Sequence, residues 1–285
     1  MKAWKWILRA LAIGLVITIV GSWWMASQLI APHHKPVGAP PAELQAELLA
    51  FDNGQGVTIK GWHVDVEESR GVVLLLHGLG GSRWQMVPRA KFLQRAGYSS
   101  VLIDLRAHGE SEGDEIGLGW LERHDVRATY EFAREAHPGE PVFAVASSLG
   151  GASLLLTEGL ELDGVVLEAV YSRIRPAVRN RVALRSDALS GILTELLLVQ
   201  LRPRLGVSEA DLAPIDGLAK LDCPVLIMAG AEDVYTPASE TREMFAAANE
   251  PKELWLLEGV GHFDLQSAAP SEYERRVLAL LERAR

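Results

Sequence analysis

The feature that most constrains the fold is an alternation of short apolar segments with amphipathic ones from about residue 47 onward. Short apolar segments are typical of buried strands, and a 3.6-residue spacing is typical of helices. The pattern therefore predicts an α/β domain whose central sheet is mostly parallel, with helices on both faces. We expect strands at residues 57–64, 71–77, 99–105, 141–146, 165–169, 224–229 and 253–257. We expect helices at residues 83–96, 125–136, 150–158, 237–248 and 271–284.

A candidate nucleophile follows the fourth predicted strand, in the sequence A-S-S-L-G-G at residues 146–151. Ligand sites of parallel sheets lie beyond the carboxyl ends of the strands. A nucleophilic serine on a strand-to-helix turn needs small residues on either side, because the turn is strained and the helix packs closely. Ser148 lies between Ala146 and Gly150, whereas Ser147 has large neighbours at the equivalent positions. Ser148 is therefore the predicted nucleophile.

A base and an acid follow the last two predicted strands. A serine hydroxyl is a poor nucleophile unless a base takes its proton. His262 follows the last strand and is the predicted base. Glu232 and Asp233 follow the strand before it, and we choose Asp233 as the acid, with Glu232 as a solvated neighbour. The order Ser148, Asp233, His262 is the order found in α/β hydrolases.

Five motifs together resemble the α/β-hydrolase superfamily. They are H-G-L-G-G-S (77–82), D-L-R-A-H-G-E-S (104–111), A-S-S-L-G-G, P-V-L-I-M-A-G-A-E-D and G-H-F. From about residue 50 to the end the chain is similar to this family, notably its membrane-anchored, serine aminopeptidase-like or lysophospholipase-like branch. Ala107 and Ala146 stand where the family pattern has glycine. The resemblance implies an oxyanion hole made by the backbone N–H groups of Leu79 and Leu149, with no cofactor and no metal.

Residues 171–222 interrupt the alternation, and the family position implies a small helical lid. Its first part holds a cluster of basic residues, Arg173, Arg175, Arg179, Arg181 and Arg185. The cluster is interpreted either as a site for an anionic substrate group or acidic lipid, or as a solvated helix face with ion pairs. Its second part holds an apolar surface that fits either the roof of an acyl pocket or packing against the core. That surface comprises Ile192, Leu193, Leu196, Leu197, Val199 and Leu201.

The N-terminal segment reads as a separate unit. Residues 10–30 carry no charge, and at ~1.5 Å per residue they span about 31 Å, close to the hydrocarbon thickness of a bilayer. Lys2, Lys5 and Arg9 precede this stretch. The segment predicts a single-pass anchor at residues 1–31, with the catalytic domain on the extracytoplasmic side, periplasmic in a Gram-negative bacterium.

A cleaved signal peptide is the alternative interpretation of this segment. The apolar run is longer than usual for a signal peptide, and no A-x-A-like cleavage site follows it. Residues 32–46 are rich in proline and are expected to be a linker before a domain at 47–285.

The composition narrows the possible functions. A net charge of -9 argues against a nucleic-acid partner, and the lone Cys223 excludes an internal disulfide. We predict a serine hydrolase that cleaves an ester or thioester through an acyl-enzyme, and the tether and apolar insert favour a small lipid-like acyl substrate. The alternatives are a non-catalytic tethered binding scaffold and an aminopeptidase-like amide hydrolase. The latter needs carboxylates for the substrate amine, for which the candidates are Glu110, Glu112, Asp114 and Glu115.

Overall fold

The computed structural model describes residues 3–262 and 264–283, and its largest element is one eight-stranded sheet. The strand order is β10-β9-β8-β7-β4-β5-β3-β2, and only β2 and β3 pair in antiparallel fashion with their neighbours. The strands are β2 (Glu47–Asp52), β3 (Thr58–Val64), β4 (Val72–Leu76), β5 (Ser99–Ile103), β7 (Val142–Ser147), β8 (Gly164–Glu168), β9 (Val225–Gly230) and β10 (Lys252–Leu257). The predicted, mostly parallel sheet is confirmed.

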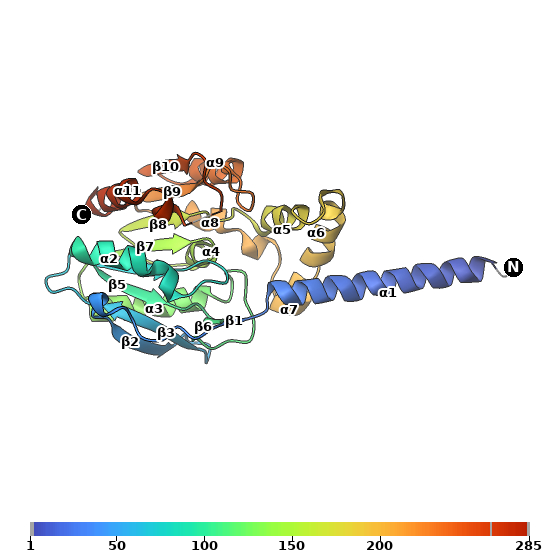
Figure 1. Ribbon diagram of the computed structural model, residues 1–285, viewed down its shortest axis with the longest axis horizontal. Helices are drawn as coiled ribbons and strands as arrows, with labels where there is room; N and C mark the ends of the chain where they lie inside the picture. Colours follow the sequence, from blue (N-terminus) through green and yellow to red (C-terminus); the bar gives the residue numbers. More distant parts are fainter. Residues whose placement is uncertain (1–2, 263, 284–285) are drawn as a thin grey trace.

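Helices cover both faces of the sheet (Figure 1). One face carries α3 (Arg123–Ala136), α4 (Leu149–Leu155), α8 (Pro214–Leu218) and α9 (Ala238–Ala247). The other carries α2 (Val87–Arg95), α10 (Leu265–Ala268) and α11 (Pro270–Arg283). In β4, Leu74 and Leu76 enter the first core, whereas Val73 and Leu75 enter the second. Successive side chains of a strand point to opposite faces, so an uninterrupted apolar strand supplies both cores.

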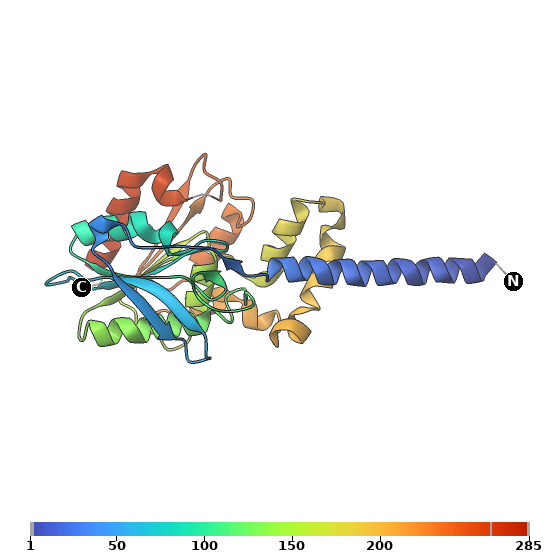
Figure 2. The same ribbon diagram turned by 60° about the horizontal axis from the view of Figure 1, so that its bottom comes forward.

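The edge of the sheet departs from the prediction. All seven predicted strands are present, but β2 is an additional strand, and it forms a hairpin with β3 at the sheet edge (Figure 2). Only one side of β2 packs on the core, through Leu49 and Phe51, so its apolar pattern is weak. The helix expected at residues 83–96 begins as a 3₁₀ turn at Arg83–Met86. Phe263 of the histidine motif and Ala284 of the closing helix lie outside the described residues.

The segment expected to be a linker lies against the domain. Within residues 32–46, β1 (His33–His34) pairs in parallel with β6 (His108–Gly109). Val37 and Leu44 are buried. A proline-rich composition indicates little regular structure, but it does not prevent backbone pairing or burial of single apolar side chains.

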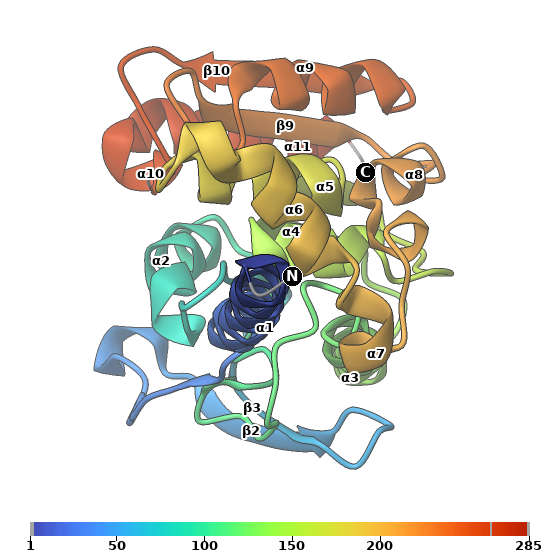
Figure 3. The ribbon, with the colours of Figure 1, turned by 90° about the vertical axis from the view of Figure 1, so that its right-hand side faces the viewer.

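The interval between β8 and β9 consists of helices. The α5 (Ile174–Ala183), α6 (Ser190–Leu198) and α7 (Leu201–Leu205) helices lie beyond the carboxyl ends of the parallel strands, on the side from which α1 (Ala3–Leu29) leaves the domain (Figures 1 and 3). Residues Trp4–Leu29 of α1 are long and apolar enough to cross a membrane, with a mean hydropathy of 1.8. A signal sequence near an N-terminus has the same properties.

Candidate active site

Ser148 occupies a strained turn between β7 and α4. Its backbone has φ 46° and ψ −108°, a conformation that costs energy in any residue except glycine. Gly150 permits the turn, since a Cβ there would lie 2.7 Å from the carbonyl oxygen of Leu76. The N–H of Ser148 donates to the carbonyl of Glu168 at 2.8 Å. The backbone therefore holds the predicted nucleophile at the carboxyl edge of the sheet.

Asp233 and His262 are brought together by the loops after β9 and β10. His262 Nδ1 donates to Asp233 Oδ2 at 2.6 Å. The other carboxylate oxygen accepts from the backbone N–H groups of Tyr235 and Thr236. Burial alone raises the pKa of Asp233, but the hydrogen bonds from His262 and Thr236 outweigh it and hold this pKa below its usual value. Glu232 is exposed, so of the two carboxylates considered, Asp233 is the partner of the histidine.

Tyr235 lies between the cavity of Ser148 and the ring of His262. Its ring lies 5.1 Å from the ring of His262, centroid to centroid, and it lines the same cavity as Ser148. Across residues 3–262 and 264–283, no hydrogen bond joins Ser148 Oγ to His262. The Nε2 atom of His262 forms no hydrogen bond with any of these residues, and only Nδ1 is bonded. Because Asp233 occupies Nδ1, Nε2 is the nitrogen that can take a proton from a hydroxyl group.

Two backbone donors lie beside the nucleophile. A Cβ on Gly78 would lie 3.4 Å from the Cβ of Ser148, so the loop after β4 passes close to the serine. Leu79 and Leu149 line the same cavity as Ser148. In the described part of the chain, neither of their N–H groups donates a hydrogen bond. Both therefore have the donor capacity that the predicted oxyanion hole requires.

His77 braces this loop. Its Nδ1 donates to the carbonyl of Gly78 at 2.7 Å, and its Nε2 accepts from the N–H of Leu105 at 3.0 Å. Burial lowers the pKa of His77 to about 3. The ring is therefore neutral near pH 7, with both nitrogens engaged in holding the loop.

A buried ion-pair network, which the sequence analysis did not predict, connects the segments that carry Ser148 and His262. Arg89 on α2 donates to both carboxylate oxygens of Glu168, at 2.9 and 2.6 Å, and to Asp264 at 2.8 Å. Glu168 accepts the N–H of Ser148 through its carbonyl, and Asp264 follows His262 closely. The network thus links the segments that carry the two residues. The signal in the sequence was an arginine on the apolar face of a predicted helix.

Ser148 opens onto a cavity of about 460 Å³. The lining is mostly apolar and comes from α1, the loop after β4, and the helices α4, α5 and α6. Its charged members among the described residues are Arg181 and Arg185, and it contains no carboxylate. Leu193 and Leu197 of the predicted apolar surface line this cavity, whereas Ile192 and Val199 are exposed.

The arginine cluster of the lid is divided between two environments. Arg173 and Arg175 form ion pairs with glutamates, as a solvated helix face does. Arg179 is exposed. Arg181 lies over the Tyr235 ring and donates to a backbone carbonyl of its own helix. Arg181 and Arg185 border the Ser148 cavity. The solvated-face interpretation therefore fits Arg173 and Arg175, whereas the binding of an anionic group stays a prediction.

The carboxylates considered for amine binding lie around another cavity. Glu110, Glu112, Asp114 and Glu115 border a space of about 640 Å³ that does not include Ser148. Glu110 is paired with Arg83 and also accepts two backbone N–H groups. The two backbone hydrogen bonds, and to a smaller extent the pairing with Arg83, lower the pKa of Glu110 to about 2, although desolvation acts in the opposite direction. Its carboxylate is already satisfied by the protein.

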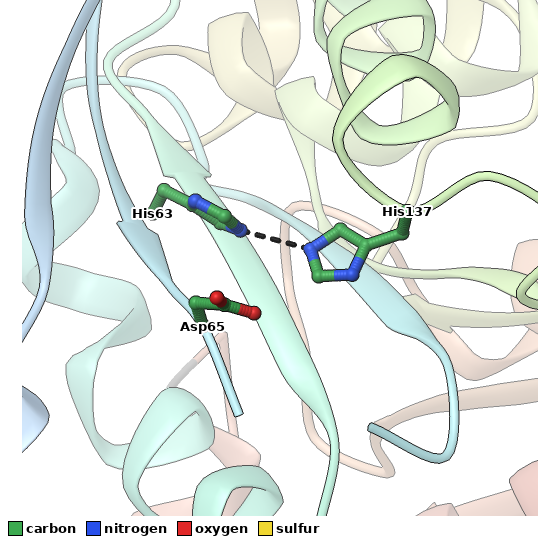
Figure 4. Close-up of side chains that lie close together, drawn as sticks. All are labelled: His63, Asp65 and His137. Atoms are coloured by element: carbon green, nitrogen blue, oxygen red, sulfur yellow. Dashed lines mark hydrogen bonds between the residues drawn. The ribbon is translucent and has the colours of Figure 1, made fainter. Parts of the chain in front are cut away.

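A group of two histidines and an aspartate consists of residue types that can bind a metal ion. It lies at the amino edge of the sheet, opposite the candidate active site. The ligand atoms of His63, Asp65 and His137 lie within 4.8 Å of one another (Figure 4). The Nε2 atoms of the two histidines are 2.9 Å apart, which fits one hydrogen bond. Two nitrogens bound to one tetrahedral zinc ion at ~2.05 Å lie about 3.3 Å apart. The geometry therefore favours a hydrogen bond between the two imidazole rings, in which one Nε2 donates and the other accepts.

Comparison with known proteins identifies a family of hydrolases and several relatives of this chain. A family described as serine aminopeptidase, S33, matches residues 67–214. The uncharacterized protein Rv2307c of Mycobacterium tuberculosis is 29% identical over 270 residues, which cover 90% of this chain and 89% of that protein. Lysophosphatidylserine lipase ABHD12 of Danio rerio is 25% identical over 197 residues, 66% of this chain and 50% of the lipase.

A solved structure shows the same architecture. The esterase Pf2001 of Pyrococcus furiosus superposes with a TM-score of 0.74 at 20% sequence identity, over 89% of this chain and 97% of that one. At this identity the likeness concerns the fold alone. It confirms the predicted α/β-hydrolase fold.

Proposed function

Because the chain belongs to the serine aminopeptidase S33 family of α/β hydrolases, we propose that it is a membrane-anchored serine esterase. Ser148 is the nucleophile, His262 the base, and Asp233 the acid that orients the histidine. The observation that carries the proposal is the position of Ser148, on a strained turn that opens into an apolar cavity. The hydrogen bond between Asp233 and His262 supports the roles of the other two residues.

The reaction follows from these positions. Ser148 Oγ attacks the ester carbonyl carbon while His262 Nε2 takes the hydroxyl proton. The oxyanion that forms accepts hydrogen bonds from the N–H groups of Leu79 and Leu149. The tetrahedral intermediate expels the alcohol, which receives the proton from His262. Water then attacks the acyl-enzyme by the same route and releases the carboxylic acid.

The cavity favours an apolar acyl group over a substrate amine. An aminopeptidase must bind a protonated amine, for which a nearby carboxylate is the natural partner. The described residues that line the Ser148 cavity include two arginines and no acid, and arginines repel a cation. The lipid substrate in the name of the Danio rerio relative agrees with an ester whose acyl chain is apolar.

We further propose that α1 remains attached as a membrane anchor, with the catalytic domain on the extracytoplasmic side. The basic residues that precede the uncharged stretch of residues 10–30 support this orientation. Support for retention comes from the contacts that the end of α1 makes with the helices of the lid. A signal peptide destined for removal has no need of such contacts.

A fluorophosphonate probe tests the nucleophile directly. The full-length protein in detergent is treated with the probe, and the modified residue is located by mass spectrometry. We expect labelling of Ser148, loss of labelling in Ser148→Ala, and normal labelling in Ser147→Ala, which changes the adjacent serine. Persistent labelling of Ser148→Ala at another residue would refute the assignment.

A substrate panel separates the possible activities. p-Nitrophenyl esters and acyl thioesters are compared with aminoacyl anilides, using the full-length protein and Ser148→Ala as the blank. We expect turnover of esters with medium or long acyl chains. Preferential turnover of the anilides would establish an aminopeptidase instead, and ligand binding without turnover of any substrate would favour a binding scaffold.

A further inference from the structure

One face of the anchor helix packs against the lid. Ser22, Met25, Ala26 and Leu29 follow the spacing that places residues on one side of a helix. Ser22 and Ala26 are buried, in contrast to the rest of α1, which is exposed along most of its length. Ala26 packs in a small apolar cluster with residues of α5 and α6, and α1 lies beside α6 (Figure 3).

Polar contacts fix the position of this helix face. The guanidinium of Arg204, on α7, lies 3.9 Å from the centre of the Trp23 ring. Arg204 also donates to the carbonyl of Trp23 at 2.6 Å and to Ser27 Oγ at 3.1 Å. Gln200 donates to Ser22 Oγ at 3.3 Å. The anchor therefore has one defined orientation against the lid.

This orientation makes the anchor part of the cavity at Ser148. Met25 and Leu29 both line the cavity, together with Leu193 and Leu197 of α6. One wall of the candidate acyl site is therefore formed by a helix that is otherwise suited to cross a membrane. Removal of α1 would open that wall to solvent.

The same geometry places the cavity at the membrane surface. Trp6 and Trp23 are separated along the helix by about 26 Å, so they suit the two interfaces of a bilayer. Leu29 then lies roughly 9 Å above the level of Trp23, in the headgroup region. The segment that contains α5 and α6 stands on the side where α1 leaves (Figure 1). Four large apolar side chains in or next to these helices are more than half exposed: Leu184, Leu189, Ile192 and Val199.

We propose that the substrate is a lipid ester drawn from the adjacent membrane leaflet, and that its acyl chain enters along α1 and lies against Met25 and Leu29. The inference rests on the proposed function, since Ser148 must react with the ester carbonyl. Under this inference, α1 has two roles: it tethers the enzyme to the membrane, and it helps to determine which acyl chain is bound. The exposed apolar residues of the lid are its second contact with the lipid.

A photoreactive inhibitor tests this arrangement. The probe is a decyl fluorophosphonate with a diazirine at the chain terminus, applied to the full-length protein in phospholipid nanodiscs. Ser148 Oγ forms a bond to phosphorus, fluoride leaves, and His262 takes the hydroxyl proton. Light then expels nitrogen from the diazirine, and the carbene inserts into a neighbouring bond. We expect cross-links at the end of α1 around Met25 and Leu29, located by tandem mass spectrometry within the tryptic peptide of residues 10–60, since the Lys35–Pro36 bond resists trypsin.

The two possible failures of this experiment are distinguishable. Labelling of Ser148 with cross-links that never include the end of α1 around Met25 and Leu29 would overturn the inference and leave the proposed function standing. Absence of any labelling at Ser148 would overturn the proposed function and the inference together.

A pair of variants tests the wall independently. Leu29→Trp fills part of the cavity, whereas the control Gln28→Trp adds the same bulk on an exposed position of α1. At ~0.8 kcal/mol per buried methylene group, exclusion of two or more groups lowers kcat/KM about 10-fold. We expect the ratio of kcat/KM for a dodecanoyl ester to that for a butyryl ester to fall by this factor in Leu29→Trp. An equal ratio in both variants would contradict the inference.

Discussion

Two groups of interacting side chains that contain histidine lie at opposite edges of the same sheet, and they differ in the partners of the ring nitrogens. At the carboxyl edge, His262 bonds Asp233 through Nδ1 and keeps Nε2 without a partner in the described chain. At the amino edge, His63 and His137 bond each other through both Nε2 atoms. His262 is partly exposed, and its neighbour Tyr235 lines the cavity of Ser148, whereas the histidines of the second cluster are buried.

The difference shows that a histidine near an acid is not by itself a catalytic group. His63 also has an aspartate in its vicinity, Asp65, yet its reactive nitrogen is engaged in a hydrogen bond. Burial and the neighbouring His137 outweigh the nearby acids and lower the pKa of His63. A base needs an unoccupied nitrogen and a route for substrate. Of these two clusters, the one at the carboxyl edge keeps His262 Nε2 without a partner among the described residues, and the neighbouring Tyr235 lines the cavity of Ser148.

The largest expected effect tests the acid of the carboxyl-edge cluster. Asp233→Asn removes the charge that stabilises protonated His262 and alters the tautomer of the ring. We expect kcat for a p-nitrophenyl ester to fall about 10³–10⁴-fold, by analogy with triads of the same type. The control is Glu232→Gln, at the exposed neighbouring position, and kcat should stay within twofold of the parent. Similar losses in both variants would refute the role of Asp233.

The next effect concerns the network that supports the carboxyl edge. Arg89→Met leaves Glu168 buried without its cation, and the loss of one partner of a buried ion pair costs about 3–5 kcal/mol. We expect a loss of this size in the free energy of unfolding, measured by chemical denaturation in detergent. Arg95→Met, on the exposed side of the same helix, should cost less than about 1 kcal/mol. Equal losses in the two variants would show that the buried ion pair contributes no more to the free energy of unfolding than an exposed one.

The turn that carries Ser148 should be sensitive to a single methyl group. Gly150→Ala places a Cβ 2.7 Å from backbone atoms that cannot easily move, and overpacking of this kind costs ~1–3 kcal/mol. Gly191→Ala, on α6, is the control because a Cβ at that position would meet no described atom within 4 Å. We expect a lower melting temperature for the first variant and an unchanged or slightly higher one for the second.

Much of this architecture followed from the sequence because its signals are local. The apolar segments predicted the sheet, and the spacing around Ser148 distinguished it from Ser147. Contacts between distant segments were not predictable in this way. The pairing of Arg89 with Glu168 joins residues far apart in the chain, and the packing of α1 against the lid depends on the folded position of α6. Periodicity reveals that α1 is apolar, but it does not reveal which face of α1 meets the protein.

The smallest expected effect concerns the amino-edge cluster and depends on pH. His63→Gln keeps a hydrogen-bonding group beside His137, so we expect a loss of only ~1 kcal/mol in the free energy of unfolding at pH 7.5. In the parent, the lowered pKa of His63 means that its contribution is present above pH ~6.5 and is lost as the pH falls toward the folded-state pKa. The difference between variant and parent should therefore shrink as the pH falls below 6.5. A constant difference would show that His63 is not held neutral by burial, whereas a change in esterase kcat would show that the two edges of the sheet are coupled.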